Sequence, residues 1–586
     1  MAKGEVVRSE SDVLVIGGGI TAVFAAIKAR EAGAKVALVD KVFFGRGGCS
    51  ALASGVLKIF FPEEDNMEAW VHGGTGGPTT RAFANEPLVR KAIGLSTEIC
   101  TLMDRWGVKW IKDGGKILRV GSPGVEGPCN AMLDGGGPMM MMALRGEVLR
   151  RGIQVVNRVQ LHDLLTSDGQ HPTRGRVVGA IGVNTRSGAV HVFEARVTIC
   201  ATGPFHVPYP RLDRPYRLYG MPVDLSGDGH AMMLRAGAVM GKLEFGGMAI
   251  SPWHFFAAPG MEMLFGLGGT SVLVNNKGER FLAHKNHRKE MTGRSSISLA
   301  VARELKEGRG PVCVDITFFT PEQRRLLKQV IPIVMGNWEA AGFDPAKDAV
   351  PYTSIFMATH SVSGGGVQVN EQMETTLPGL LAGGNCSDGA YMSMAQALPQ
   401  CAAMGYIAGE NAGVTYAGTA KPALVEEQVK SLQEEILRPL KREGKVTYEA
   451  VHGHIDDLYS NFIGLTLREE MGQKAVALIQ GPLRDSLGKI RARDPRELGK
   501  VLGLKNFVQA LEAILQVLLH RKESRGNVLR PDYPRIDNVE WLKYTRARLE
   551  HGGQLTIWDE PLPQERIDSL PRTKELHPFF RDVVIS

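Results

Sequence analysis

Residues 11–41 read SDVLVIGGGITAVFAAIKAREAGAKVALVDK, and this stretch decides the fold. Residues 12–16 form a short apolar run, partly β-branched, which predicts a buried parallel strand. Residues 20–31 carry apolar and alanine positions at helical spacing, and residues 35–39 predict a second strand that ends at Asp40. A strand, a glycine-rich turn, a helix and a strand within about thirty residues are typical of a βαβ unit.

The glycines at the turn have the spacing of a dinucleotide site. Gly17 permits the tight turn, Gly19 lets the backbone approach a pyrophosphate, and Ala22 is small enough for close packing of helix and strand. The helix N-terminus offers unpaired N–H groups to the phosphates. Asp40 follows about twenty residues later, where a carboxylate accepts hydrogen bonds from ribose hydroxyls. A nucleotide-free α/β unit is the less favoured interpretation, because both strands, the helix and the acid are in register.

Length and composition indicate an ordinary globular protein. The chain has 586 residues, enough for two or three domains with large cores. Charged residues make up 22% and hydrophobic residues 44% of the chain. The formal charge of +7 is small for this length, and no dense run of Lys and Arg with interleaved aromatic residues occurs. We therefore do not expect a nucleic-acid partner.

The seven cysteines are dispersed, and none forms a CxxC pair. This usage argues against a disulfide framework and for a reducing compartment. It also argues against an iron–sulfur cluster or other metal site within this chain. Residues 1–10 contain no apolar signal segment, and we find no apolar stretch long and clean enough to span a membrane. We therefore expect a cytoplasmic chain.

Two further segments favour a flavin. Residues 44–59, FGRGGCSALASGVLKI, form a loop of small side chains against which a flat ring system could lie. The strand predicted at 190–201 follows a hairpin turn at 186–188 and ends in VTICATGP, which contains Thr202 and Gly203. A buried strand that closes on A-T-G after such a hairpin is typical of flavin-dependent Rossmann domains.

Four consecutive methionines, 139–142, lie in a helix predicted at 135–151. Methionines can form a soft wall near a ligand. At helical spacing at least some of them face the core, which is the interpretation we favour.

The order of motifs resembles one family: the flavoprotein subunits of succinate dehydrogenase and fumarate reductase, together with L-aspartate oxidase and adenylylsulfate reductase. The matching segments are IGGGITA with Asp40, RGGCSALASG, VTICATG, SGDGHAMMLRAGA, LEF, VNNKGERF, TGRSSISLA, THSVSGGGV, PGLLAGGN and RKESRGNVLRPDYPRIDNVEWLKY. The hairpin GAIGVNTRSGAVHVF and the segment EGRGPVCVDIT are most similar to the adenylylsulfate reductase branch.

The resemblance implies an α/β fold with a Rossmann-like FAD-binding domain (residues 1–215 and 350–415), an inserted α+β capping domain (216–349) and a helical C-terminal domain (416–586). It implies an FAD-dependent oxidoreductase that acts on a small-molecule substrate and exchanges electrons with a ferredoxin-like iron–sulfur subunit in a hetero-oligomer. The cofactor-binding residues that the turn and the resemblance predict are Gly17, Gly19, Ile20, Thr21, Ala22, Asp40, Lys41, Gly47, Gly48, Cys49, Ser50, Ser54, Gly55, Ala201, Thr202, Gly203, Asp228, Gly384 and Asn385.

Departures from the family pattern bear on the attachment of FAD and on the substrate. Respiratory members attach FAD covalently through a histidine; aligned on Arg46, that position is Gly48, so FAD should be bound non-covalently. Ala249 stands where dicarboxylate-handling members carry a histidine, and residues 385–401 lack their carboxylate-binding arginine. Asn385 replaces the usual acidic residue near the ribityl chain. We therefore expect a substrate that is not a simple C4 dicarboxylate.

Two catalytic positions of the family are kept. Arg294 in TGRSS matches the family's proton-delivering arginine, and His360 in THSVSGGGV matches the histidine of its H-x-x-x-G-G segment. The alternative roles are a helix-terminal salt bridge for Arg294 and a satisfied strand–loop histidine for His360; the ordered motifs around both favour function.

Three functions stay open. The first is an FAD oxidoreductase for a substrate other than a small dicarboxylate. The second is sulfur chemistry of the adenylylsulfate reductase type, which the hairpin favours; against it, Ser251 is the nearest residue to that enzyme's substrate arginine. The third is a flavin-bearing electron-transfer subunit that has no substrate site.

Overall fold

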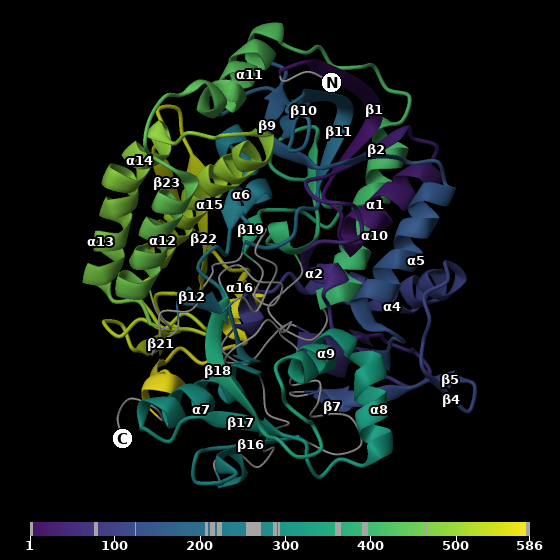
Figure 1. Ribbon diagram of the computed structural model, residues 1–586, viewed down its shortest axis with the longest axis vertical. Coiled ribbons are helices and arrows are strands. Elements are labelled where there is room, and N and C mark those ends of the chain that lie inside the picture. Colours follow the sequence, from purple (N-terminus) through teal and green to yellow (C-terminus); the bar gives the residue numbers. More distant parts are fainter. Residues whose placement is uncertain are drawn as a thin grey trace.

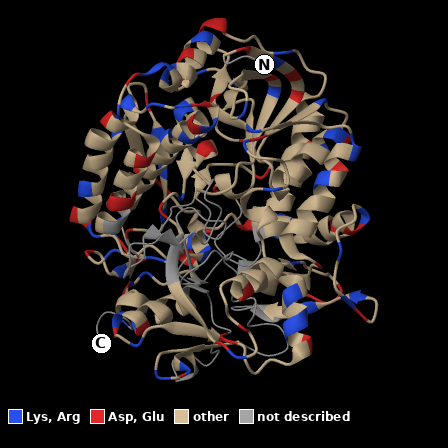
Figure 2. Cartoon of the chain, in the orientation of Figure 1, with Lys and Arg blue, Asp and Glu red and all other residues tan. Residues whose placement is uncertain are grey.

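The computed structural model describes residues 4–74, 80–122, 125–205, 209–210, 217–218, 225–252, 271–284, 290, 294–357, 365–389, 397–463 and 466–581. In Figure 1 the first sheet lies at the top of the view, a second sheet lies at the bottom and the C-terminal helices lie at the left. Figure 2 shows Lys, Arg, Asp and Glu spread over the outer helices and loops.

A seven-stranded sheet contains the predicted βαβ unit. Its order is β8-β2-β1-β11-β10-β9, and β20 also pairs with β11. The strands β8, β2, β1, β11 and β20 are parallel, whereas β9, β10 and β11 form an antiparallel meander. The bounds are β1 Val6–Ile16, β2 Val36–Asp40, β8 Gln154–Asn157, β9 Val159–Thr166, β10 Val177–Asn184, β11 Val190–Cys200 and β20 Leu380–Ala382. Because β20 lies beside β11, the chain returns to the first domain after a long insertion, as predicted.

Two helices from distant parts of the chain pack closely against each other over this sheet. These are α1 (Ile20–Glu31) and α10 (Ala397–Tyr416), and α4 (Glu86–Arg105) and α5 (Gly136–Arg150) lie beside them. A Cβ atom at Gly405 or Gly409 would overlap the carbonyl oxygen of Thr21 or Ala25. The glycines of α10 therefore allow backbone to meet backbone, which joins the returning chain to the first βαβ unit.

The inserted part is built on an antiparallel four-stranded sheet in the order β15-β18-β17-β16. Its core contains Trp338 and Tyr352, whose rings meet edge to face. The elements are β15 Gly247–Pro252, β16 Val272–Val274, α7 Arg294–Lys306, β17 Val312–Asp315, α8 Pro321–Val330, α9 Pro332–Ala340 and β18 Val350–Met357.

The sheets divide the chain differently from the expected boundaries at 216 and 349. The strand β18 begins at Val350, yet it pairs with β15 and β17 of the insertion. At the other boundary, α6 (Asp228–Ala236) packs on β9 and on the C-terminal helix α15. The sheet of the insertion therefore spans 247–357. Sheet membership depends on long-range pairing, which local sequence patterns do not report.

The C-terminal part is helical, as expected, up to His520, and then adds short strands. β22 pairs with β14, so the end of the chain closes onto the segment before the insertion. The elements are α11 Glu426–Lys441, α12 Tyr448–Phe462, α13 Glu469–Leu478, α14 Arg484–Lys489, α15 Pro495–His520, β21 Arg535–Asp537, β22 Lys543–Leu549, β23 Leu555–Pro561, α16 Gln564–Asp568 and β24 Lys574–Leu576.

The helix α15 corrects the expectation that no segment is apolar and long enough to cross a membrane. By length and composition Pro495–His520 qualifies, but 72% of its apolar window is buried inside the protein. It packs against β9, β10, α6, α11 and α13. A core helix of this kind is apolar on nearly all sides because other elements surround it.

Side-chain caps fix where several helices begin. Asn85 accepts a hydrogen bond from Leu88 N at the start of α4, Asp494 does so from Glu497 N at the start of α15, and Thr320 and Gln323 form a capping box on α8. The remaining short elements are α2 Gly48–Ala51, β3 Val56–Lys58, α3 Met67–Gly74, β4 Lys112–Asp113, β5 Lys116–Ile117, β6 Arg119–Ser122, β7 Val125–Met132, β12 Tyr209–Pro210, β13 Arg217–Leu218, β14 Met240–Gly241 and β19 Gly366–Val367.

Candidate functional site

The glycine-rich turn lies where the ends of β1, β2 and β11 meet. Gly17 N donates to Val39 O at 2.8 Å, and Ala201 N donates to Ile16 O at 2.8 Å. Gly17 has φ +124°, and a Cβ atom there would overlap the carbonyl oxygen of Ala201. Only glycine fits, because any side chain would push the ends of β1 and β11 apart.

The N-terminus of α1 opens on this turn. Gly19 caps the helix with an extended backbone and no side-chain hydrogen bond, and no acidic residue lies in the first turn. Ile20 N donates to Ser50 Oγ at 3.1 Å, which brings the helix α2 and its hydroxyl to the same point. Backbone donors, a hydroxyl and a helix dipole whose first turn carries no acidic residue are the groups that bind phosphate.

Asp40 is the predicted acceptor for a ribose. It ends β2, is 7% exposed, and its Oδ1 accepts from Val42 N at 3.3 Å. A Cβ atom at Gly18 would overlap the carboxylate of Asp40, so the acid lies directly on the glycine turn. The N-terminus of α1 and the Asp40 carboxylate therefore lie in one place, and their roles toward phosphate and ribose stay predictions.

Lys41 and Asp228 form an ion pair of 2.7 Å that connects this turn to the start of α6. The other carboxylate oxygen of Asp228 accepts from Gln160 Nε2 at 2.9 Å and from Asn506 Nδ2 at 2.8 Å. Burial raises the pKa of the Asp228 carboxyl, but the Lys41 ammonium and the hydrogen bonds outweigh burial and hold that pKa below its ordinary value. Both oxygens of Asp228 thus bind protein groups, and its contact with a cofactor remains a prediction.

Sequence reasoning missed Gln160 and Asn506. Each is a buried polar residue within an apolar run, VQLHDLL or LKNFVQAL. A buried amide needs hydrogen-bond partners. A polar residue inside an apolar run is therefore the sequence signal that could have identified these two positions.

The returning chain completes the rim of the site. Gly383 N donates to Cys200 O at 3.0 Å, and a Cβ atom at Gly384 would lie 2.5 Å from Thr21 Oγ1. The amide oxygen of Asn385 accepts from the Cys401 thiol at 3.4 Å. The predicted segment 383–385 therefore lies against the first turn of α1 and the end of β11.

Not all of the other predicted residues lie at this turn. Gly55 N donates to Val330 O at 2.9 Å, so Gly55 contacts the insertion through the C-terminal end of α8. Arg294 is the first residue of α7, but its side chain lies outside the described residues, and so does all of His360. The structure therefore places Asp40, Ser50 and Gly384 at the β1–α1 turn, and the cofactor and catalytic roles of the predicted residues stay predictions.

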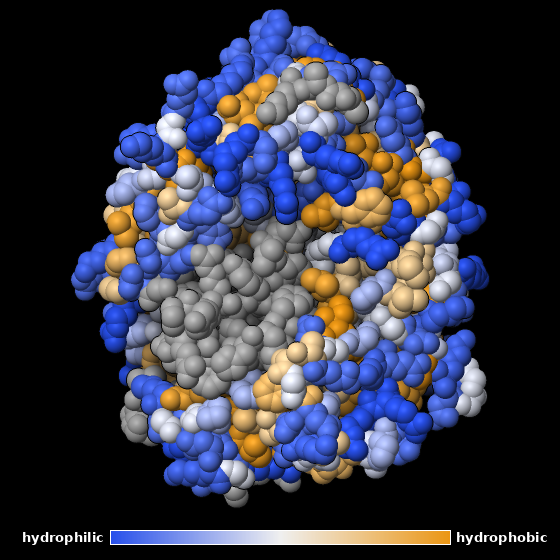
Figure 3. All heavy atoms as spheres, in the orientation of Figure 1, coloured by the Kyte–Doolittle hydropathy of each residue, from blue (hydrophilic) through white to orange (hydrophobic). Residues whose placement is uncertain are grey.

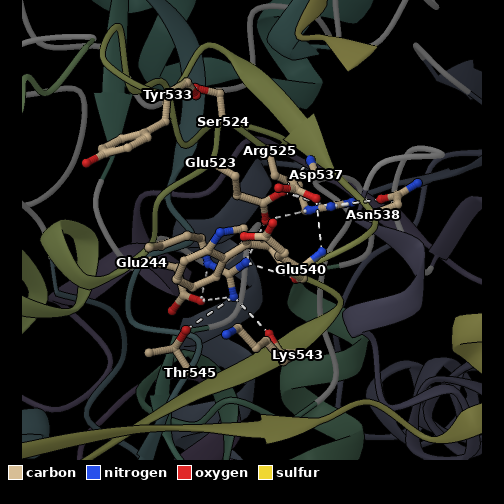
Figure 4. A network of polar contacts seen from close by, with 12 residues as sticks. Glu244, Glu523, Ser524, Arg525, Tyr533, Asp537, Asn538, Glu540, Lys543 and Thr545 are labelled. Carbon is tan, nitrogen blue, oxygen red and sulfur yellow. Dashed lines mark hydrogen bonds and ion pairs between the residues drawn. The ribbon is translucent and has the colours of Figure 1, made fainter. Parts of the chain in front are cut away.

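Two motifs that are far apart in sequence meet in a buried ionic network (Figure 4). Arg521 Nε donates to Glu244 Oε1 at 3.0 Å, and Arg521 Nη1 donates to Glu523 Oε1 at 2.6 Å. Arg525 Nε shares Glu523 Oε1 at 2.8 Å, and Arg525 Nη2 donates to Asn538 at 2.9 Å. The two arginines and the two glutamates are almost fully buried. The network holds the C-terminal part against the turn that leads into β15.

Comparison with known proteins identifies the family that shares this fold. A family model described as FAD binding domain matches residues 12–401, and a second, described as fumarate reductase flavoprotein C-term, matches residues 474–578. The chain belongs to the fumarate reductase and succinate dehydrogenase flavoprotein family. Members of this flavoprotein family are FAD-dependent oxidoreductases, and the donors and acceptor around α1 are of the kinds that FAD requires.

Relatives match over nearly the whole chain. A chain of the CoM/CoB fumarate reductase of Methanothermobacter marburgensis is 26% identical over 566 residues, covering 91% of this chain and 96% of the relative. The fumarate reductase flavoprotein subunit of Escherichia coli is 24% identical, covering 97% and 96%.

Solved structures show the same fold. E. coli quinol fumarate reductase FrdA superposes with a TM-score of 0.82 at 22% identity, covering 97% of this chain and 98% of that chain. Adenylylsulfate reductase from Archaeoglobus fulgidus gives 0.80 at 20% identity, covering 96% and 98%. At these identities the structures show the fold alone.

Proposed function

We propose that this flavoprotein binds FAD non-covalently, transfers hydride to or from a substrate other than a simple C4 dicarboxylate, and exchanges electrons with an iron–sulfur subunit. The observation that carries the proposal is the set of residues at the family's attachment and anchoring positions. Relatives named as flavoprotein subunits support a partner chain.

Gly48 supports non-covalent binding. It has no side-chain atom to bond to a flavin, and it has φ +73°, a conformation that favours glycine. It begins α2, two residues before Ser50, whose hydroxyl binds the N-terminus of α1. The attachment position therefore adjoins the cofactor site but carries no nucleophile.

Ala249 and the segment 385–401 support a different substrate. Ala249 lies on β15 opposite Ile355 of β18, and an alanine methyl cannot donate a hydrogen bond to a carboxylate. Residues 385–401 contain neither Arg nor His. Without these anchors, a doubly charged acid would lose charge-assisted hydrogen bonds worth about 1.5–3 kcal/mol each.

The remaining chemistry follows from the cofactor and from two residues of this chain. When bound, FAD supplies a two-electron hydride donor or acceptor. Arg294 delivers the accompanying proton. A free guanidinium stays protonated to above about pH 12 and does not readily give up its own proton, so Arg294 passes the proton through a relay. His360 orients the substrate and stabilises the charge that develops on it, a role typically worth about 10²–10⁴-fold in rate.

A viologen-linked assay tests the proposal without any partner chain. FAD-loaded protein and reduced methyl viologen are mixed with fumarate, with neutral esters of unsaturated acids, or with adenylylsulfate, and the oxidation of viologen is followed. We expect turnover with a neutral unsaturated substrate and none with fumarate. Efficient fumarate reduction would contradict the proposal, and turnover with adenylylsulfate alone would establish the second candidate, which the β10–β11 hairpin favours. Arg294→Ala and His360→Ala should abolish turnover but leave FAD bound; full FAD loading without turnover of any substrate would indicate an electron-transfer subunit.

A further inference from the structure

Lys242 carries a buried charge that no neighbouring group compensates directly. It follows β14 and is 3% exposed, and within the described part of the chain its ammonium forms no hydrogen bond or ion pair. Hydrophilic residues cover much of the visible face of the molecule (Figure 3), and a lysine side chain ordinarily lies among them. Burial lowers the pKa of the Lys242 ammonium to about 8. A charge held in this way is costly unless a ligand or a counter-ion compensates it.

The backbone at Lys242 is strained as well. Its φ is +55°, in the left-handed region that residues with a side chain rarely adopt. Lys242 O accepts from Phe245 N at 3.1 Å, and a Cβ atom at Gly365 would lie 2.6 Å from that same oxygen. Strain of this kind persists where the surrounding structure holds a residue in place, and it gathers at binding sites. The conformation therefore favours a binding role for the side chain.

Two arginines and a tyrosine surround the ammonium. Lys242 Nζ lies 6.0 Å from the centre of the Tyr544 ring, and the Arg546 guanidinium lies 4.7 Å from the same centre. Arg566 Nη1 donates to the hydroxyl of Tyr544 at 3.0 Å and to carbonyl oxygens within residues 82–84. Among the residues that the structure describes, Arg566 forms no ion pair. Three cations therefore gather around one phenol ring.

The carboxylates beside this ring are already bound. Asp388 and Glu560 both pair with Arg546, at 2.8 Å and 2.7 Å. A Cβ atom at Gly241 would overlap the carboxylate of Asp388, so this ion pair lies next to the residue before Lys242. Three cations thus face two carboxylates, and both carboxylates bind the same arginine.

Glu244 does not supply the missing charge. Its Oε1 accepts from Arg521 Nε at 3.0 Å, and it forms no ion pair with Lys242. The attraction of Asp388 and Glu244 raises the pKa of Lys242, but burial and the two arginines outweigh that attraction. The surroundings therefore disfavour the ammonium as they stand, and one additional anion would balance the charge.

We infer that Lys242, Arg566 and Tyr544 form a binding site for one small monoanion with a carboxylate group, at the junction of the turn before β15 with β22 and α16. The ammonium, the guanidinium and the phenol hydroxyl are hydrogen-bond donors that suit a carboxylate. The bound anion compensates the excess positive charge and fixes the C-terminal strands to that turn. None of the three residues is a predicted cofactor or catalytic residue, so the inference does not depend on the proposed function.

Thermal unfolding of the FAD-loaded protein in sodium formate tests the inference. Formate replaces gluconate, a carboxylate too large for a buried site, at constant ionic strength. The native midpoint should rise with formate, because a ligand that binds only the folded protein stabilises it. Lys242→Met should abolish the rise. The control Lys505→Met removes another lysine whose pKa burial lowers, but this lysine lies 3.9 Å from Glu435; the variant should respond to formate as the native protein does.

Calorimetric titration with formate gives a second measurement. Tyr544→Phe removes one hydroxyl and should weaken formate binding about tenfold, the loss expected for a hydrogen bond to a charged group. Native affinity should fall about tenfold between pH 7 and pH 9, because the site binds the ammonium form of Lys242, whose pKa is about 8. The other charged or titratable groups at the site are Asp388, Glu244, Glu560, Arg546, Arg566 and Tyr544. Carboxylates and guanidinium groups ordinarily titrate far from this range, and burial raises the pKa of Tyr544 further above it.

A native midpoint that does not respond to formate would overturn the inference, as would an equal response in Lys242→Met. Loss of the response in Lys505→Met as well would reveal a general effect of charge and would overturn it too. If Lys242→Met does not fold, unchanged formate affinity in Tyr544→Phe or a native affinity independent of pH would have the same consequence.

Discussion

Arg521→Met should be among the most destabilising single substitutions in this chain. Arg521 is fully buried, and it donates to two carboxylates, to Thr545 Oγ1 at 3.2 Å and to the backbone oxygens of Trp541 at 3.3 Å and Lys543 at 2.9 Å. Glu244 accepts through Oε1 from Arg521 only, and within the described chain its Oε2 has no partner. The substitution therefore leaves the Glu244 carboxylate buried without a hydrogen-bond partner among the described residues.

The expected cost is about 3–5 kcal/mol, the usual result of removing one partner of a buried ion pair. Most of it comes from Glu244, because Glu523 keeps Arg525 as its partner. The double variant Arg521→Met with Glu244→Gln removes the stranded charge and should recover a large part of the loss. The neighbouring Lys522→Met is the matched control: its ammonium is partly exposed and pairs with Glu469, so it should cost at most about 1 kcal/mol.

Urea unfolding followed by tryptophan fluorescence measures these differences in FAD-loaded protein. The midpoint should fall most in Arg521→Met, less in the double variant and least in Lys522→Met. If Arg521→Met unfolds at the same midpoint as Lys522→Met, or if the double variant is no more stable than the single one, the network does not hold the C-terminal part in place.

Three further predictions concern the cofactor site. Asp40→Ala should weaken FAD binding by roughly 1.5–3 kcal/mol, the value of hydrogen bonds to a charged group; titration of apoprotein with FAD measures this, and unchanged affinity would contradict the role of Asp40. Lys41→Met should reduce the acid sensitivity of folding, because the lowered pKa of Asp228 gives stability that is complete above about pH 4 and lost as the pH falls below that value. The unfolding midpoints of the native protein and the variant should therefore converge in acid. Parallel pH profiles of the two proteins would refute the pairing. Gly409→Leu should separate α10 from α1 and cause poor folding and loss of FAD, because a Cβ atom there overlaps the Ala25 carbonyl. The control Gly418→Leu, in the turn after α10 and in open space, should be tolerated better despite its φ of +72°. Equal behaviour of the two variants would show that the helices do not need close contact.

The sequence predicted the parts of this fold that local chemistry determines. The glycine spacing at 17–19 and Asp40 indicated the βαβ unit and the cofactor site, because the turn, the helix and the acid lie within one short segment. The buried methionines of α5 agreed with the core interpretation for Met140 and Met141, but the exposure of Met139 and Met142 depends on what packs against that helix.

Long-range relations were not readable from local patterns. The motifs containing Glu244 and Arg521 were both recognised, yet nothing near either residue indicated that they form an ion pair. Asn506 reaches Asp228 from a helix 278 residues later, and β18 joins the inserted sheet through pairing with β15 and β17. The roles of Arg294 and His360 also stay predictions, since their side chains lie outside the described residues.

Acid precipitation of the purified, FAD-loaded protein tests the central claim most directly. Non-covalent FAD at the β1–α1 turn predicts a yellow native protein, a colourless acid pellet and one FAD per chain in the supernatant by mass spectrometry. A pellet that keeps the colour would contradict non-covalent binding. A native protein that is colourless when fully loaded, or that releases only a nicotinamide nucleotide, would contradict the assignment of the site to FAD.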